Sequence, residues 1–579
     1  MATGAEGLAA GRAGASTGKS DRELSNPVLL ALIWLCGASA FLLLLWGSKL
    51  SFLLDDWEFL IYRRGFNAHA ILEPHGEHIS IAPVLIYKAL LATVGMGSAL
   101  PFRVVSTALF ILSAALFFVL LLRRVGQWPA LGATVLLLFV GAAWEDLLWA
   151  FQIGYFGSMA AGLGMLLALE RGDRRGDRLA CLLLAISVVF SSLGLSFAIA
   201  AAVAVLLQPG RRGRLYVFVF PLILYAAWWL GWGHNAESAL SAANVAKTPN
   251  FVADGIASSM ASIFGFFGPD RAGLDWGRPL AVAAVVLVVW RVYKLGRPST
   301  WFWIVLALGA SFWILAGLNQ IPGRTPDASR YQYVAVVFAL LVFAELLRGV
   351  RFSRGALLTG AVVVAAITAA NIGYLHAAWD SYREISQLEK ADLGAVEIAR
   401  GTVEPGFTLS EDIAGTGYVH IEAGPYLSAR DAFGSPAYNP AELAESSAAS
   451  RFFADKVLFA ALRISPQPAP GAAGSGAKPA AANAEGLVEV PPRGCVSVPG
   501  GGEAPQLSLP RRGVLLQAGN RPVDSLELRR FASEEFPIEL EARIEPGRTL
   551  EIPIPPDRSS VPWKLELESE GTTTACGIG

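Results

Sequence analysis

The segment from Pro27 to Ser48 constrains the fold of this chain most, because none of its 22 residues carries a charge. An α-helix of about 20 apolar residues is long enough to cross the hydrocarbon core of a bilayer. The remaining sequence is similar, since 54% of all 579 residues are hydrophobic and only 16% are charged. The composition therefore predicts an α-helical polytopic membrane protein and not a soluble protein with one large core.

Further apolar runs predict about 11 transmembrane helices in all. These segments are residues 28–48, 101–122, 128–143, 153–170, 178–192, 194–208, 215–232, 278–294, 300–318, 330–348 and 355–375. The division of 178–208 at Ser191-Ser192 rests on charge, because it places all the arginine-rich connections on one side of the membrane. Cytoplasmic loops carry an excess of Lys and Arg, so that side is predicted to be the cytoplasm.

This orientation assigns a compartment to each end of the chain. Residues 1–27 lack the short apolar core and cleavage site of a signal peptide, and we expect them to form a cytoplasmic tail. The loops at 49–100, 144–152, 233–276 and 319–329, and everything after His376, are predicted to be extracytoplasmic. No organelle address is visible, which favours the cytoplasmic (inner) membrane of a bacterium. Within the first loop, Ile79–Val94 is expected to lie along the membrane surface, with Tyr87 and Lys88 as interfacial anchors.

The C-terminal third is predicted to contain three regions. Residues 376–464 mix helical stretches and loops, residues 465–486 form a flexible Pro/Ala/Gly linker, and residues 487–579 alternate apolar and polar side chains as a small β-sandwich does. Cys495 and Cys576 flank this last module. In an oxidising compartment a disulfide between them is favoured over a metal site, since no histidine lies nearby. The module is at least as consistent with a stabilising or docking role as with glycan binding.

Four polar groups fall in the predicted extracytoplasmic loops. They are Asp55, Asp56 and Glu58; Glu73, His75, Glu77 and His78; Glu145, Asp146 and Gln152; and Arg324 and Arg330. A carboxylate suits deprotonation of an acceptor hydroxyl, and an arginine suits stabilisation of a leaving phosphate. A single acid pair beside a helix is more often a solvated cap, but carboxylates and guanidiniums in loops on one side together favour catalysis.

The sequence gives no firm metal site. His75-x-x-His78 with Glu77 has ligand-type side chains, but Pro74 and Gly76 indicate a shaped turn whose histidines bond locally. No metal ligands are therefore assigned, and a divalent cation stays open as a cofactor. The net charge of −1 gives no indication of a nucleic-acid partner.

The order of these motifs resembles that of the GT-C membrane glycosyltransferases, in the branch of protein O-mannosyltransferases and lipid A aminoarabinose transferases. The segments that carry the resemblance are LDDWEFL, EPHGEHISIAP, LIYKALLATVG, PFRVVSTALF, WEDLLWAFQIGYFGSM and SRYQYVAVVFALLVFAELL, within residues 28–375. The resemblance implies a catalytic carboxylate at Asp55 or Asp56, a substrate-orienting pair at Glu145-Asp146, and a phosphate contact at Arg330-Tyr331. The sequence departs from the family pattern at two places. PHGEH stands where relatives have His-Pro-Pro, and the resemblance matches His78 to the family's histidine. Arg330-Tyr331 is followed by Gln-Tyr where relatives have Leu-Leu-Pro.

The expected function is therefore transfer of a sugar from a polyprenyl-phosphate-linked donor to an extracytoplasmic acceptor, by carboxylate-assisted inverting displacement. The acceptor is a cell-envelope glycan, a glycolipid or a protein. His78, Gln152 and Arg324 complete the expected substrate-binding set. One alternative is a transporter or flippase of lipid-linked glycans, which is disfavoured by the scarcity of charges within the helices and the lack of an internal repeat. Another is a non-catalytic glycan-binding membrane scaffold.

Overall fold

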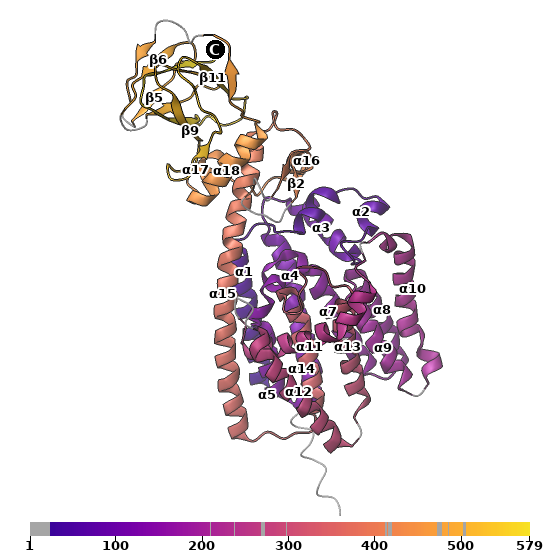
Figure 1. The fold of residues 1–579 in the computed structure, drawn as a ribbon. Helices are drawn as coiled ribbons and strands as arrows, with labels where there is room; N and C mark the ends of the chain where they lie inside the picture. The colour runs from indigo at the N-terminus through magenta and orange to yellow at the C-terminus, as the bar shows by residue number, and fades with distance from the viewer. Residues whose placement is uncertain are drawn as a thin grey trace, which may run out of the picture. The chain divides into compact units, whose positions relative to one another are not determined.

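The computed structural model describes residues 24–579 except 209, 237, 268–272, 297, 411–413, 415–419, 472–476, 484–485 and 502–504. Most of the predicted cytoplasmic tail therefore lies outside the described residues. The described chain is mostly helical and ends in a β-rich region (Figure 1). It divides into a first unit, residues 1–49, 65–89 and 100–380, and a second unit, residues 50–64, 90–99 and 381–579.

Each of the eleven predicted segments coincides with a helix. These are α1 (Asn26–Gly47), α4 (Leu100–Val125), α5 (Gln127–Leu138), α7 (Ile153–Leu169), α8 (Arg174–Phe190), α9 (Gly194–Leu206), α10 (Tyr216–Gly231), α12 (Gly273–Leu295), α13 (Thr300–Leu318), α14 (Ser329–Leu346) and α15 (Arg354–Ile398). Seven helices of the described chain are long and apolar enough to cross a membrane. An eighth span exists if α5 and the following helical residues Gly141–Leu148, bent by 41°, form one crossing. The helical part is thus that of a polytopic membrane protein.

The break predicted at Ser191-Ser192 is present. Ser191 has extended backbone angles, φ −164° and ψ 155°, directly after α8. The chain then turns so tightly that a Cβ on Gly194 would lie 2.6 Å from the backbone of Val188. Only glycine fits this approach, and it separates α8 from α9. At 13 residues, α9 is about 20 Å long and is shorter than a typical crossing.

One long helix was not predicted. Residues 233–276 were expected to be a loop, but α11 (Ala242–Phe264) occupies 23 of them. Hydropathy misses this helix because Asn, Lys, Thr, Asp and Ser interrupt its apolar residues. Its Ala/Ser face is nevertheless buried, with Ala257, Ser258 and Ser262 at 0–1% exposure. Small side chains allow such close helix packing, and α11 contacts α12, α13 and α14.

The expected surface helix at 79–94 is α3 (Ile81–Val94), which begins in the first unit and ends in the second. Its predicted interfacial anchors do not face outwards. Tyr87 is fully buried and its ring lies 4.9 Å from that of Phe102. Lys88 is 5% exposed and its Nζ donates to the carbonyl oxygen of Gly65 at 2.5 Å. A nearby carbonyl satisfies the ammonium group inside the fold, so an anchoring role for either residue is wrong.

The second unit combines short helices with two sheets. Its helices are the π-helix η2 (Glu58–Tyr62), the end of α15, α16 (Ala423–Phe433), α17 (Pro440–Ala444) and α18 (Ala448–Ala461). A short hairpin pairs β1 (Thr408–Leu409) with β2 (Ile421–Glu422). Asp455 of α18 is buried, and its carboxylate accepts the backbone N–H groups of Arg530, Phe531 and Ala532 at 2.7–3.0 Å. This carboxylate joins α18 to the end of a strand.

Eleven strands of the described chain form the two sheets. One has the order β10 (Ile538–Glu539), β9 (Val523–Arg529), β12 (Lys564–Ser569), β7 (Gln506–Ser508) and β5 (Leu487–Glu489). The other has the order β3 (Gln467–Ala469), β11 (Thr549–Pro553), β8 (Gly513–Ala518), β13 (Thr573–Gly577), β6 (Cys495–Val498) and β4 (Lys478–Pro479). Alternate residues of the longer strands are buried, as expected when each sheet has one face in a core.

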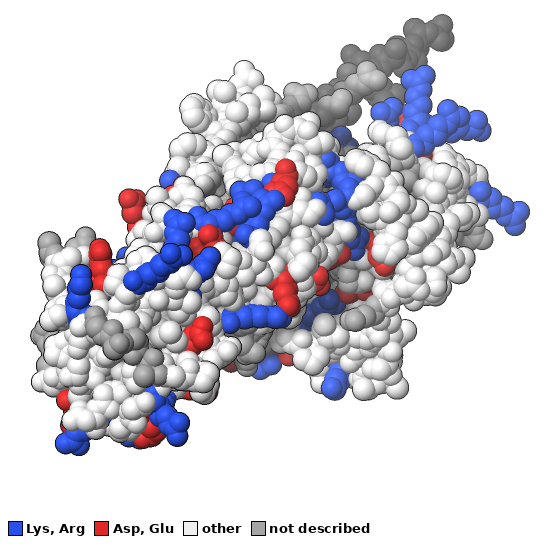
Figure 2. Space-filling model, turned by 90° about the horizontal axis from the view of Figure 1, so that it is seen from above, with Lys and Arg blue, Asp and Glu red and all other residues white. Residues whose placement is uncertain are grey.

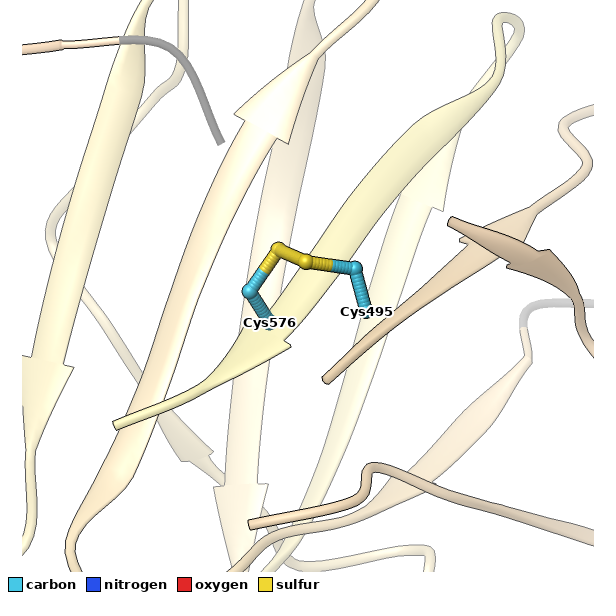
Figure 3. Close-up of a disulfide and its surroundings, with 2 residues drawn as sticks. All are labelled: Cys495 and Cys576. Atoms are coloured by element: carbon cyan, nitrogen blue, oxygen red, sulfur yellow. A yellow bond between two sulfur atoms is a disulfide. The ribbon is translucent and has the colours of Figure 1, made fainter. Parts of the chain in front are cut away.

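Two features of this region concern the sequence predictions. Cys495 and Cys576 are cross-strand neighbours on β6 and β13 and form a disulfide (Figure 3). The predicted linker 465–486 is used in part as structure, because β3 pairs with β11 and β4 pairs with β6. Backbone pairing at the sheet edges orders Gln467–Ala469 and Lys478–Pro479, which contain no large apolar side chain.

Charged side chains are mixed on the face drawn in Figure 2. Lys and Arg lie among Asp and Glu, and most of that face is uncharged.

Candidate functional site

The Pro-His-Gly-Glu-His segment of the first unit forms a closed turn. The backbone groups of His75 and His78 exchange two hydrogen bonds of 3.0 and 2.9 Å. Gly76 lies between them with φ +53°, a left-handed conformation that favours glycine. The ring of His75 packs 4.9 Å from that of Phe151, and the ring of His78 lies 6.3 Å from that of Tyr155. The turn is thereby held against the residues that precede and begin α7.

Glu77 at the tip of this turn forms an ion pair with Arg324. Both side chains are about one-quarter exposed, at 25% and 24%, so the pair is neither dry nor fully solvated. Although burial opposes ionisation, the adjacent His78 and Arg324 lower the pKa of Glu77 below its usual value. The carboxylate therefore stays charged and holds the guanidinium in place at neutral pH.

A second arginine is held by the acidic loop at 144–146. Glu145 Oε2 accepts the backbone N–H of Arg330 at 2.8 Å and lies 3.9 Å from its Nε. The N–H of Glu145 donates to Ser329 Oγ at 3.0 Å, and that hydroxyl donates to the carbonyl of Ala142 at 2.7 Å. These bonds join the first turn of α14 to the start of α6 (Trp144–Leu148). The Arg330 side chain keeps 37% exposure.

Gln332 fixes the end of the loop that carries Arg324 and leads into Arg330 of α14. It is fully buried, and its Nε2 lies 3.1 and 3.2 Å from the carbonyl oxygens of Pro326 and Ala328. Its Oε1 accepts from Ser262 of α11 at 2.9 Å. Ser258, also on α11, donates to the Pro326 carbonyl at 3.0 Å. Gln332 is one of the residues at which this sequence departs from the family that it resembles, and these bonds explain the glutamine structurally.

Three other predicted residues are buried in the first unit. Asp146 has no exposed surface, and Gln152 is 4% exposed at the end of the 3₁₀ turn η4 (Ala150–Gln152). The ring of Tyr331 packs among Phe312 and Trp313, at 6.1 and 5.9 Å. Because these three side chains are buried, they are better placed to support the site than to contact a substrate directly.

The Asp55-Asp56 pair belongs to the second unit, where the two carboxylates differ. Asp56 is fully buried, its Oδ2 accepts the N–H of Leu53 at 2.9 Å, and its own N–H donates to the Leu53 carbonyl. The intervening Leu54 has φ +48°, an uncommon conformation for a non-glycine residue. Asp55 follows this residue and is half-buried. Asp56 therefore closes a strained turn, and this turn holds the neighbouring Asp55 in a half-buried position.

The wall behind this turn is the end of α15. Ser51 N–H donates to Ser386 Oγ at 3.1 Å, and Trp57 Nε1 donates to Glu389 Oε2 at 3.0 Å. Trp57 and Glu389 are 2% and 1% exposed. These buried bonds fix the backbone on both sides of the acid pair.

Chemically, the first unit presents two arginines that are oriented by carboxylates and still reach solvent. Guanidiniums of this kind bind and stabilise a phosphate through paired hydrogen bonds. Among the described residues, no three His, Cys, Asp or Glu side chains group closely enough to hold a metal ion. Sequence reasoning missed Ser329 and Gln332, although a glutamine inside an apolar helix was a visible signal.

Comparison with known proteins adds no identification. No protein-family model matches the chain, and no curated protein matches it.

Proposed function

We propose that this chain is an integral-membrane glycosyltransferase of the GT-C class with about 11 transmembrane helices. The donor is a polyprenyl-phosphate-linked sugar, and the acceptor is an extracytoplasmic glycan, glycolipid or protein. The observation that carries the proposal is the pair Arg324 and Arg330, each beside a carboxylate and each partly exposed. Helices at all eleven predicted positions and the motif order within residues 28–375 also support it.

In this proposal the arginines act on the leaving group. Charge develops on the bridging and terminal oxygens of the phosphate as the bond to the anomeric carbon breaks. Arg330 and Arg324 stabilise that charge, and Glu145 and Glu77 hold the two side chains in position beforehand. Removal of one such donor typically costs about 10²–10³-fold in rate.

The base is assigned to Asp55. Its carboxylate takes the proton of the acceptor hydroxyl, whose oxygen attacks the anomeric carbon while polyprenyl phosphate departs with the bonding electrons. Direct displacement inverts the anomeric centre. Asp56 is assigned to the backbone turn, because it is buried and bonded to Leu53 N–H. Asp55 belongs to the second unit, and the two arginines belong to the first.

The test is sugar transfer in proteoliposomes, with labelled polyprenyl-phosphate sugars and a crude cell-envelope acceptor. We expect Arg330→Ala to lower transfer by at least about 100-fold. A suitable control is Arg278→Ala, because Arg278 also pairs with an acid, Asp254, at 3.0 Å but lies outside this site. Asp55→Asn should abolish transfer without unfolding the protein, whereas Asp56→Asn should lower stability.

Transfer that survives Arg330→Ala and Asp55→Asn would overturn the assignment. Movement of labelled lipid across the bilayer without cleavage of its sugar bond would instead identify a transporter.

A further inference from the structure

A groove lies between α4, α7 and α8 of the first unit, and none of its lining residues belongs to the candidate site. It has a volume of about 630 Å³, within the range of ligand-binding cavities. Its floor is made by the small residues of α7, which are Gly157, Ala160, Ala161, Gly164 and Ala168. Its rims include Leu112, Leu179 and Ile186, which are 49%, 41% and 38% exposed.

The groove has a length that suits a lipid chain. Along α4 its lining runs from Leu109 to Arg123, which is about 21 Å of helix. One leaflet of the hydrocarbon core is about 15 Å thick, so an acyl chain that enters from the headgroup level fits along the groove. The lining is apolar except at one end.

That end is basic. Arg123 and Arg171 line it, with side chains 53% and 52% exposed. Arg123 pairs with Glu170 at 2.6 Å, but Glu170 also pairs at 2.6 Å with the buried Arg124. Arg171 pairs with Asp173 at 3.3 Å.

Basic residues outnumber acids around this end of the groove. Residues 170–178 contain four arginines and three carboxylates, and Arg123 with Arg124 adds two more arginines. A net positive charge at the end of an apolar channel is complementary to a lipid with an anionic head.

We propose that this groove binds an anionic phospholipid, with an acyl chain along α7 and the phosphate at Arg123 and Arg171. Basic pockets between transmembrane helices bind anionic headgroups in this way. Arg123 is in the last turn of α4, and Arg171 follows the end of α7 by two residues. Small residues on a helix also favour packing against a second protein helix, but the arginines at one end favour the lipid.

Native mass spectrometry of the full chain, reconstituted with phosphatidylglycerol or phosphatidylcholine, tests the proposal. Wild type should retain one phosphatidylglycerol in preference to phosphatidylcholine. Arg123→Gln/Arg171→Gln should weaken phosphatidylglycerol retention at least tenfold, which is about 1.4 kcal/mol. Leu112→Trp/Leu179→Trp, which fills the groove from its exposed rims, should abolish retention with the arginines intact. Arg351→Gln, at an exposed arginine outside the groove, should change nothing.

Equal retention of both lipids by wild type, or unchanged phosphatidylglycerol retention in both double variants, would overturn the proposal. So would a dimeric mass that Leu112→Trp/Leu179→Trp converts to monomer, since a second chain would then occupy the groove. Displacement of phosphatidylglycerol by equimolar polyprenyl phosphate would overturn the choice of occupant. Thermal unfolding in the same detergent establishes that each variant is folded.

Discussion

At the scale of single residues, the fold separates side chains that the sequence makes look equivalent. Asp55 and Asp56 are adjacent acids, yet one closes a turn through Leu53 and the other is half-buried beyond it. Arg324 and Arg330 each pair with a glutamate that is distant in sequence. Residue type and order could predict these candidates, whereas their division into buried and partly exposed groups depends on contacts far apart in sequence.

Gln332 allows a direct test of site support. Gln332→Leu keeps the side-chain size roughly constant but leaves the Ala328 carbonyl without its amide donor. We expect a loss of about 1–3 kcal/mol in the free energy of unfolding, because the buried hydrogen bonds of this amide to Pro326, Ala328 and Ser262 are lost. Sugar transfer should fall as well, through displacement of Arg330. Gln320→Leu is the control, since the side chain of Gln320 donates to the nearby carbonyl of Gly317; equal effects of the two changes would refute the positioning role.

Acid should weaken the Glu77–Arg324 pair. The folded-state pKa of Glu77 lies below its usual value of 4.5, so its stabilising contribution is present above that pH and is lost as pH falls through the lowered pKa. For this partly exposed pair we expect about 1 kcal/mol. The difference in unfolding free energy between wild type and Glu77→Gln should be constant from pH 7 to 5 and should shrink below pH 4. A difference that grows on acidification would contradict this.

At the scale of elements, helix positions follow from hydropathy, but helix packing does not. The break between α8 and α9 was predictable from charge, and the structure explains it by the close approach of Gly194 to Val188. By contrast, α11 was missed, because its buried face consists mostly of small residues such as Ala and Ser, with few large apolar side chains among them. A helix face built mostly of small residues gives no clear hydropathy signal. Its burial can be recognised only from the positions of the neighbouring helices.

Gly194→Ala should destabilise the first unit by about 1–3 kcal/mol, because the added Cβ would lie 2.6 Å from the Val188 backbone. Gly37→Ala in α1 is the matched change, since a Cβ there meets nothing within 4 Å. It should be neutral or stabilising through better helix propensity. Thermal unfolding followed by tryptophan fluorescence distinguishes the two; a neutral Gly194→Ala would show that α8 and α9 can separate at little cost.

At the scale of the whole molecule, composition predicted a helical membrane part followed by a β-rich part. The described chain has both, with seven or eight helices that meet the length and hydropathy of a membrane span. Sequence reasoning was weakest where backbone pairing sets the structure, as within residues 465–486, where β3 and β4 join sheet edges without large apolar side chains. The polar contacts between loops were likewise beyond prediction, because they depend on which helix ends meet.

The disulfide should contribute strongly to the stability of the second unit. Cys495 and Cys576 are 81 residues apart, and closure of so long a loop restricts the unfolded chain. Cys495→Ala/Cys576→Ala should therefore lower the free energy of unfolding by roughly 2–5 kcal/mol, measured by urea-dependent proteolysis of the C-terminal region. Cys36→Ala/Cys181→Ala, at two cysteines outside the disulfide, should leave it unchanged. If both double variants resist urea equally, the covalent link is dispensable.

The position of β13 has a consequence for biosynthesis. The last strand of the chain, Thr573–Gly577, lies between β8 and β6 and is not an edge of its sheet. Synthesis reaches β13 after β6 and β8, so these two strands must wait for it with one side unpaired. The six-stranded sheet therefore cannot close until β13 has been made, and a truncation that removes β13 would leave two strand edges open to aggregation.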